Sequence, residues 1–131
     1  MNDHLRFPIG QPERHHHLTP DQRLVLIENV AQLPVRLGVA IGGLTAAQLD
    51  TPYRPGGWTV RQVVHHFADS HMNAFVRFKL ALTEDAPTVK TYEEARWAET
   101  ADAKTPPIEL SLVLLENLHA RWVLLMRSLS D

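Results

Sequence analysis

Hydrophobic residues recur at three- and four-residue intervals in three long stretches of the chain, which is the spacing of an amphipathic α-helix. We predict helices from about Pro20 to Ile41, from Thr59 to about Leu82, and from Thr105 almost to the end of the sequence. No stretch shows sustained alternation of apolar and polar residues between hairpin signals. The pattern therefore predicts an all-α fold with three long helices.

Four threonines mark predicted helix starts. Each begins a capping box, in which a threonine and a Glu or Gln three residues later satisfy backbone N–H groups at the start of a helix. The four boxes begin at Thr19, Thr45, Thr59 and Thr91. The boxes at Thr45 and Thr91 predict short helices. Pro34 lies within the first long helix and is predicted to kink that helix or split it in two.

About twenty residues separate the second and third long helices. Connections between antiparallel neighbours in a helix bundle usually have two to eight residues. The extra length predicts a crossover that carries the chain back along the bundle, so that the third long helix runs parallel to the second.

Composition favours one globular domain over residues 1–131, with residues 1–18 as an N-terminal arm. Hydrophobic residues make up 44% and charged residues 21%, both near the averages for folded soluble domains. The formal charge of -2, without a basic stripe, excludes nucleic acid as an expected partner.

The absence of cysteine excludes a disulfide framework and a thiolate metal site, and it suits a reducing compartment. There is neither a signal-like N-terminus nor an uncharged apolar run of about 18 residues. We therefore expect a cytoplasmic protein without a membrane partner.

The second long helix carries the candidate chemistry. His66 shares a polar stripe with Gln62, Asp69, Ser70, Asn73 and Arg77, whereas His71 falls on the apolar stripe. One interpretation is that the polar stripe faces water and His71 is a core histidine with a hydrogen-bond partner. The alternative is that the stripe lines a cleft, with His66 as a metal ligand and Asp69 orienting His66 or a bound water.

The spacing alone supplies one good ligand. His65 and His66 point about 100° apart on a helix, and His66 and His71 about 140° apart, whereas a catalytic metal usually needs three protein ligands. His65 and Asp69, four residues apart, could pair in support of the site.

Three blocks of the sequence carry a family resemblance. They are "FPIG" at residues 7–10, "LDTPYRPGGWTVRQVVHHFADSHMNAFVRFKLALTE" at residues 49–84, and "LLENLHARWVLLMRSL" at residues 114–129. Across essentially its whole length, the chain resembles the YfiT-type metal-dependent hydrolases of the DinB-like superfamily.

The resemblance implies a DinB-like four-helix bundle that binds a divalent metal ion, such as zinc or nickel, through three histidines. His66 matches the ligand on the second helix, and the family's other two ligands form an H-x-x-x-H pair on the last helix. The implied activities are hydrolysis and, in bacillithiol-linked members, transfer of a small thiol to an electrophile. Asn73 and Arg77 are then candidate substrate contacts.

The sequence also departs from the family. It ends at Asp131 and contains no H-x-x-x-H, so we expect a C-terminally shortened form with three of the long helices. The histidine run His15, His16 and His17 could replace the missing ligands, but an antiparallel first helix would place it at the far end of the bundle. His119 is predicted to be a packing residue.

Three functions remain open. The first is a metal-dependent hydrolase or thiol S-transferase that acts on a small electrophile or thiol, inactive if its metal site is incomplete. The second is a non-catalytic helical module, because a missing helix would expose an apolar face suited to a homodimer or a partner helix. The third is metal buffering by the histidine-rich arm.

Overall fold

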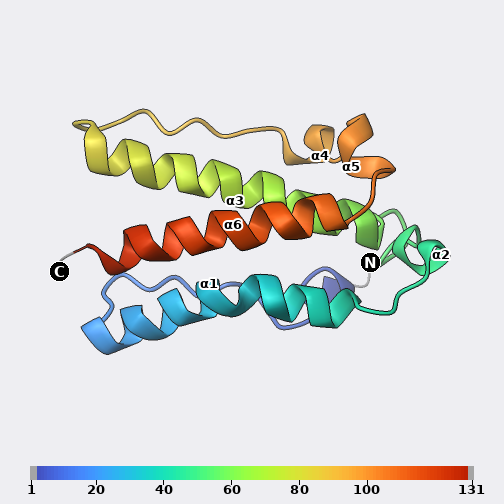
Figure 1. Cartoon of the computed structure of the whole chain (residues 1–131), viewed down its shortest axis with the longest axis horizontal. Coiled ribbons are helices and arrows are strands. Elements are labelled where there is room, and N and C mark those ends of the chain that lie inside the picture. Colours follow the sequence, from blue (N-terminus) through green and yellow to red (C-terminus); the bar gives the residue numbers. More distant parts are fainter. Residues whose placement is uncertain (1–2, 130–131) are drawn as a thin grey trace.

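The computed structural model describes residues 3–129, and the regular elements within that range are helices joined by loops (Figure 1). The described residues leave out Met1, Asn2, Ser130 and Asp131, so the two ends of the predicted domain lie outside them. Its elements are the 3-10 helix η1 (Asp3–Leu5), α1 (Pro20–Ile41), α2 (Ala46–Leu49), α3 (Val60–Thr83), α4 (Glu94–Trp97), α5 (Ala101–Lys104) and α6 (Glu109–Arg127).

The all-α prediction is confirmed for the described residues. Their only β-type pairing is an isolated bridge between Pro52 and Thr59. The three long helices α1, α3 and α6 correspond to the three amphipathic stretches of the sequence.

Three of the four predicted capping boxes are confirmed. Thr19, Thr45 and Thr59 each accept from the backbone N–H three residues later, and the glutamine at that position accepts from the threonine N–H in return. These reciprocal bonds satisfy donors that a helix start otherwise leaves unpaired. Thr59 thus begins the helix that carries the histidines.

The predicted capping box at Thr91 is wrong. The short helix α4 starts after Glu93 and has no side-chain cap. The segment before α4 is held by a bond to α3 and by a ring contact with α4 itself: Arg77 Nη2 donates to the carbonyl of Lys90 at 3.0 Å, and the ring of Tyr92 lies 4.9 Å from that of Trp97. A helix of four residues has too little cooperativity to override such contacts.

One of the two effects predicted for Pro34 is absent, and the start of the last long helix differs from prediction. Pro34 does not split α1, which runs without a break from Pro20 to Ile41. The third long helix begins at Glu109 rather than Thr105, and the short helix α5 precedes it. The second difference has a local cause, because a residue that precedes proline is disfavoured in the helical region and both Thr105 and Pro106 precede one.

The long helices lie side by side with α6 between α1 and α3 (Figure 1). α1 runs opposite to the other two, whereas α3 and α6 run in the same direction. The segment that contains α4 and α5 returns along α3 to make this possible, which confirms the predicted crossover. The buried core includes Val64 of α3 and Leu115 of α6, at 1% and 0% exposed.

α1 is unusually apolar for a helix with so little buried surface. An 18-residue stretch has a mean hydropathy of 1.5, and 6% of it is buried. By length and composition α1 could cross a membrane. The prediction that no stretch of the chain is apolar enough to span one therefore does not hold for this helix. Helices that pack inside soluble proteins meet the same criteria, and α1 packs along α6.

Candidate functional site on helix α3

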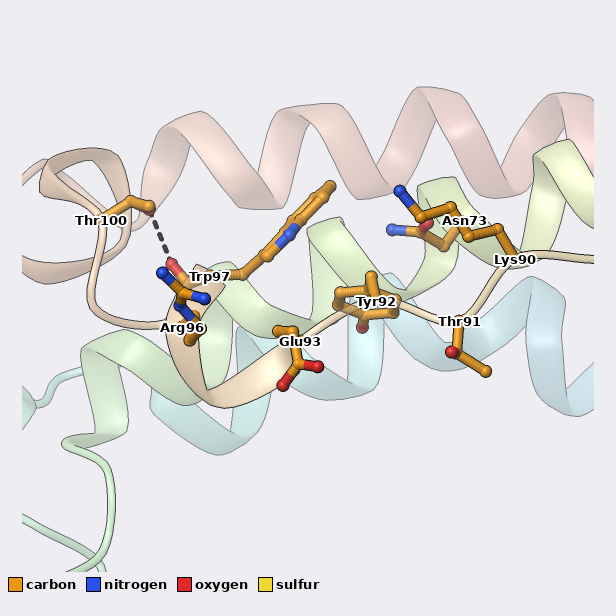
Figure 2. Close-up of a pocket in the computed structure, with 8 residues that line it drawn as sticks. All are labelled: Asn73, Lys90, Thr91, Tyr92, Glu93, Arg96, Trp97 and Thr100. Carbon is orange, nitrogen blue, oxygen red and sulfur yellow. Dashed lines mark hydrogen bonds between the residues drawn. The ribbon is translucent and has the colours of Figure 1, made fainter.

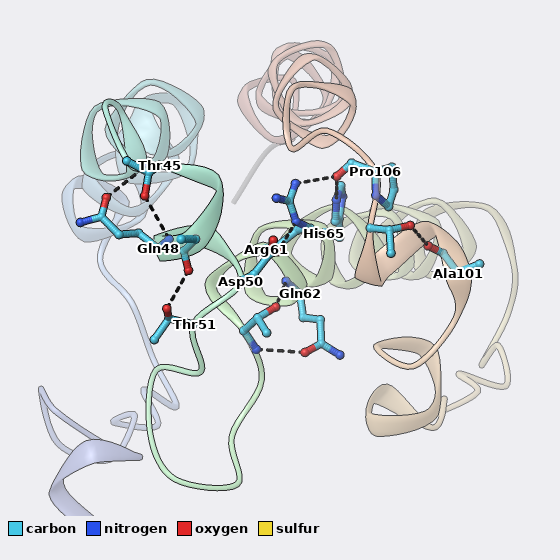
Figure 3. A network of polar contacts seen from close by, with 12 residues as sticks. Thr45, Gln48, Asp50, Thr51, Arg61, Gln62, His65, Ala101 and Pro106 are labelled. Atoms are coloured by element: carbon cyan, nitrogen blue, oxygen red, sulfur yellow. Dashed lines mark hydrogen bonds and ion pairs between the residues drawn. The ribbon is translucent and has the colours of Figure 1, made fainter.

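A polar network built on the buried side chains of Arg61 and Gln62 fixes the first turns of α3 (Figure 3). Arg61 donates from Nε to Asp50 at 2.7 Å and from Nη1 to the carbonyl of Pro106 at 3.0 Å. Gln62 donates to the carbonyl of Ala98 at 2.7 Å and is 6% exposed. The start of α3 is therefore tied both to the turn after α2 and to the crossover. The polar stripe that begins at Gln62 faces the crossover there rather than open water.

His66 is half-buried one turn after Gln62. Its Nδ1 is buried and has no hydrogen-bond partner, and its ring centroid lies 4.8 Å from that of Trp58. Burial lowers the pKa of His66 below its usual value, while the carboxylates of Asp69 and Glu94 act in the opposite direction. The imidazole is therefore neutral at pH 7, the form in which histidine binds a metal ion.

His65 does not pair with Asp69 as predicted. Its Nδ1 lies 2.6 Å from Ser111 Oγ, and its Nε2 lies 3.2 Å from the carbonyl oxygen of Pro106. The carbonyl can only accept, so Nε2 carries the proton and Nδ1 accepts from the Ser111 hydroxyl. His65 is thus a buried link between α3 and α6.

Asp69 lies one turn after His66 and lines a cavity of about 450 Å³ together with His65 and Ser111. Burial raises the pKa of Asp69, and the nearby Asp102 raises it further, while His66 and His65 lower it. Asp69 and His66 thus shift each other's pKa, although no hydrogen bond joins them within the described residues.

Asn73 and Arg77 continue the same face of α3 but lie in different surroundings. Asn73 lines a second cavity of about 760 Å³, between α3 and the crossover (Figure 2). Its Nδ2 donates to the backbone carbonyl of Asp69 at 2.8 Å. The guanidinium of Arg77 is bonded to the Lys90 carbonyl. Asp69 and Asn73 thus share a helix face and line separate cavities.

The described residues do not form a complete metal site. Across residues 3–129, no group of three His, Cys, Asp or Glu side chains gathers where it could hold a metal ion. The orphaned Nδ1 makes His66 a fitting single ligand, but at least two further ligands are lacking there. His15, His16 and His17 are exposed just before α1, at the opposite end of the bundle from the start of α3 (Figure 1).

His71 and His119 are packing residues with polar partners, as predicted. His71 Nδ1 lies 2.6 Å from His119 Nε2, and His119 Nδ1 lies 2.6 Å from the carbonyl oxygen of Val30. His119 is 1% exposed. Neither residue is part of the face that carries His66.

The crossover forms one wall of the cavity of about 760 Å³, and this wall was not predicted from the sequence. Lys90, Tyr92, Arg96 and Trp97 line the wall opposite Asn73. The signal was present in "VKTYEEARW", at residues 89–97, where cations and aromatic rings alternate within nine residues. Only the fold shows that this segment lies against α3.

Comparison with known proteins shows which family the chain resembles in sequence. The DinB superfamily profile matches residues 31–131. Proteins from Bacillus cereus strain AH820 and Bacillus thuringiensis subsp. konkukian strain 97-27, each named "Putative metal-dependent hydrolase", are 56% identical to the chain over 129 residues. Those alignments cover 98% of this chain and 73% of each relative.

A solved structure supports the same relationship. YfiT from Bacillus subtilis, described as a probable metal-dependent hydrolase with an unusual four-helix bundle topology, matches with a TM-score of 0.95 and 48% identity. The match covers 98% of this chain and 73% of YfiT. The fold and the sequence agree, and the chain belongs to the DinB superfamily.

Proposed function

We propose that this protein takes part in divalent-metal-dependent chemistry on a small-molecule electrophile in the cytoplasm, with His66 as a metal ligand. The observation that carries the proposal is the buried Nδ1 of His66, which has no hydrogen-bond partner. Leaving a buried polar atom unpaired costs about 1–3 kcal/mol, so such an atom calls for an explanation, and a bound metal ion would supply one. The names of the relatives support the reaction class.

When bound, a zinc or nickel ion would supply a water or thiol of lowered pKa as the nucleophile. Attack by water would give hydrolysis, and attack by a bacillithiol-type thiol would give S-transfer. The described chain would contribute His66 as one ligand and the carboxylate of Asp69 to orient a polar group nearby. The remaining ligands would have to come from outside residues 3–129 or from a second copy of the chain.

The test is a calorimetric titration of zinc and of nickel into the purified protein and into His66→Ala. We expect binding near one metal per chain, or one per dimer, with affinity reduced at least about tenfold in His66→Ala because one of few ligands is lost. The matched control is the His15→Ala, His16→Ala, His17→Ala triple variant, which removes exposed histidines only.

Two results would count against the proposal. Absence of tight binding in the unaltered protein would mean that the chain keeps the family fold without this chemistry. Binding that survives His66→Ala and disappears in the triple variant would instead assign metal binding to the histidine-rich arm.

Self-association is a second candidate function, because apolar side chains are exposed on two long helices. Val35 and Val39 of α1 are 70% and 76% exposed, and Leu124 of α6 is 70% exposed. Val35 and Leu124 line the same cavity of about 410 Å³ between α1 and α6. Exposed apolar patches of this kind favour association, and the occupant we propose is a second copy of the chain.

A further inference from the structure

The cavity between α3 and the crossover combines features of a small-molecule site. It has a volume of about 760 Å³, within the range of ligand cavities in proteins. Asn73 contributes from α3, and the crossover contributes Lys90, Tyr92 and Trp97. In Figure 2, the amino end of Lys90 and the carboxamide of Asn73 both extend toward the indole of Trp97. A polar pair and an aromatic surface therefore face one another.

The positive charge in this cavity is not neutralised by ion pairs. The ion pairs among the described residues join Arg61 to Asp50, Lys104 to Glu99, and Arg127 to Glu28. Neither the ammonium of Lys90 nor the guanidinium of Arg96 takes part in one. The single carboxylate of the lining, Glu93, points away from the Trp97 indole (Figure 2). The side that faces Trp97 is thus suited to an anion.

Asn73 adds a directed hydrogen-bond donor beside Lys90. One N–H of its Nδ2 donates to the Asp69 carbonyl at 2.8 Å, which fixes the orientation of the carboxamide. The second N–H of that amino group remains available. A carboxylate placed between Lys90 and Asn73 could accept from both, and a bond of this charge-assisted type is stronger than one between neutral groups.

The aromatic part of the cavity selects for a flat group. Trp97 is 39% exposed, and the ring of the half-buried Tyr92 lies 4.9 Å from it at an angle of 59°, so that a flat group stacked on the indole would meet Tyr92 at its side. Planar ligands gain on such surfaces by stacking and by burial of apolar area. The polar pair lies at the edge of this surface, so that an anionic group could be attached directly to the flat group.

We propose that this cavity binds a small planar carboxylate, an unsaturated or aromatic ring that carries one carboxyl group. The ring packs on Trp97 and Tyr92, and the carboxylate accepts from Lys90 Nζ and from the second N–H of Asn73. Arg96 adds positive charge at the rim. The role of this ligand as the electrophilic substrate rests on the proposed function, but its binding does not require a metal ion.

The test uses benzoate as the probe, titrated by calorimetry into the protein in the presence of a chelator. For a fragment of this size, we expect saturable binding in the millimolar range. Benzamide has the same shape without the charge, and cyclohexanecarboxylate has the charge without the flat ring. Both are expected to bind about tenfold more weakly than benzoate, as each loses one of the two modes of recognition.

Variants of the lining residues test whether benzoate binds in this cavity. Lys90→Gln is expected to weaken benzoate binding about tenfold, and Trp97→Leu about fivefold. Lys79→Gln removes the same charge from an exposed position outside the cavity lining, and Tyr53→Leu removes an exposed aromatic ring outside it. Both controls should bind benzoate like the unaltered protein. Circular dichroism checks that each variant is folded.

The outcomes separate this inference from the metal proposal. Benzoate binding that is weakened in Lys90→Gln and Trp97→Leu and unchanged in His66→Ala would support the cavity as the ligand site, whatever the metal result. No saturable binding, or equal binding in the cavity variants and their controls, would overturn it even if His66 binds metal.

Discussion

His71 and His119 form a direct histidine–histidine hydrogen bond between α3 and α6, with 2.6 Å between Nδ1 of His71 and Nε2 of His119. Val30 sets the proton positions, because its carbonyl oxygen can only accept and therefore requires the proton on His119 Nδ1. His119 Nε2 then accepts from His71 Nδ1. Two neutral side chains thus join all three long helices through one chain of hydrogen bonds.

Acid is expected to destabilise the fold at His71, because protonation places a positive charge on this half-buried ring. Burial lowers the pKa of His71 to about 4, and His119 and His66 lower it as well. A histidine whose pKa is lower in the folded protein gives stability that is fully present above its unfolded pKa of about 6.5 and is lost as pH falls toward 4. Since His71 is only half-buried, we expect a loss of about 1–2 kcal/mol over this interval.

The measurement is urea denaturation at pH 7 and pH 4.5, for the protein and for His71→Gln. The glutamine variant should lose less stability between the two pH values, because the titrating group is gone while an amide donor remains. An equal loss in both proteins would assign the pH dependence to other groups such as His66 and Asp69.

Removal of the central ring should be more costly than protonation. His119→Ala deletes a side chain that is 1% exposed and leaves the Val30 carbonyl and His71 Nδ1 without their partner. Cavity formation and lost hydrogen bonds together predict a decrease of about 3–4 kcal/mol in the free energy of unfolding. Chemical denaturation measures it, and His16→Ala, at an exposed position, should change it by less than about 0.5 kcal/mol.

Two glutamines in the same capping-box position allow a matched comparison. Gln62 and Gln48 both accept from the N–H of their threonine at 2.9 Å, but Gln62 also donates to the Ala98 carbonyl within the buried network. We expect Gln62→Ala to cost about 1–3 kcal/mol because it leaves that carbonyl unpaired, and Gln48→Ala, which is exposed, about 0.5 kcal/mol. Equal costs in thermal or urea unfolding would show that capping, rather than the contact with the crossover, dominates at Gln62.

Charge on the exposed apolar face should block self-association. Val35→Glu together with Leu124→Glu places two carboxylates in the cavity between α1 and α6. If two chains associate through this face, size-exclusion chromatography with light scattering should show a dimer for the unaltered protein and a monomer for the double variant. Ala40→Glu adds charge at an exposed position of α1 and should leave the dimer intact. A monomer in every case would contradict self-association.

Local signals predicted those elements whose start depends on their own residues. Thr59 and Gln62 cap α3 through contacts three residues apart, so the sequence was sufficient to place its start. Thr91 carries the same signal, but the neighbouring carbonyl of Lys90 is held by Arg77 of α3, and the segment is not helical there. The start of α6 at Glu109 has a local cause instead, because Thr105 and Pro106 each precede a proline.

The candidate site was predictable to the extent that it lies on one helix. Helical periodicity placed His66, Asp69 and Asn73 on one face of α3, and the structure keeps them there. Periodicity could not show that His65 prefers Ser111 to Asp69, because that choice depends on a residue 46 positions away. The same limit applies to Lys90 and Trp97, whose proximity to Asn73 comes from the path of the crossover.

The parallel arrangement of α3 and α6 also constrains how the chain can fold as it is synthesised. α1 and α3 each pack more on α6 than on any other helix, and α6 is made after both. Until α6 leaves the ribosome, the two earlier helices lack the surface that holds them together, and their apolar faces remain in water. We therefore expect the packed structure to form only after α6 is made, and a chain that stops before α6 to be a substrate for chaperones and proteases rather than a smaller domain.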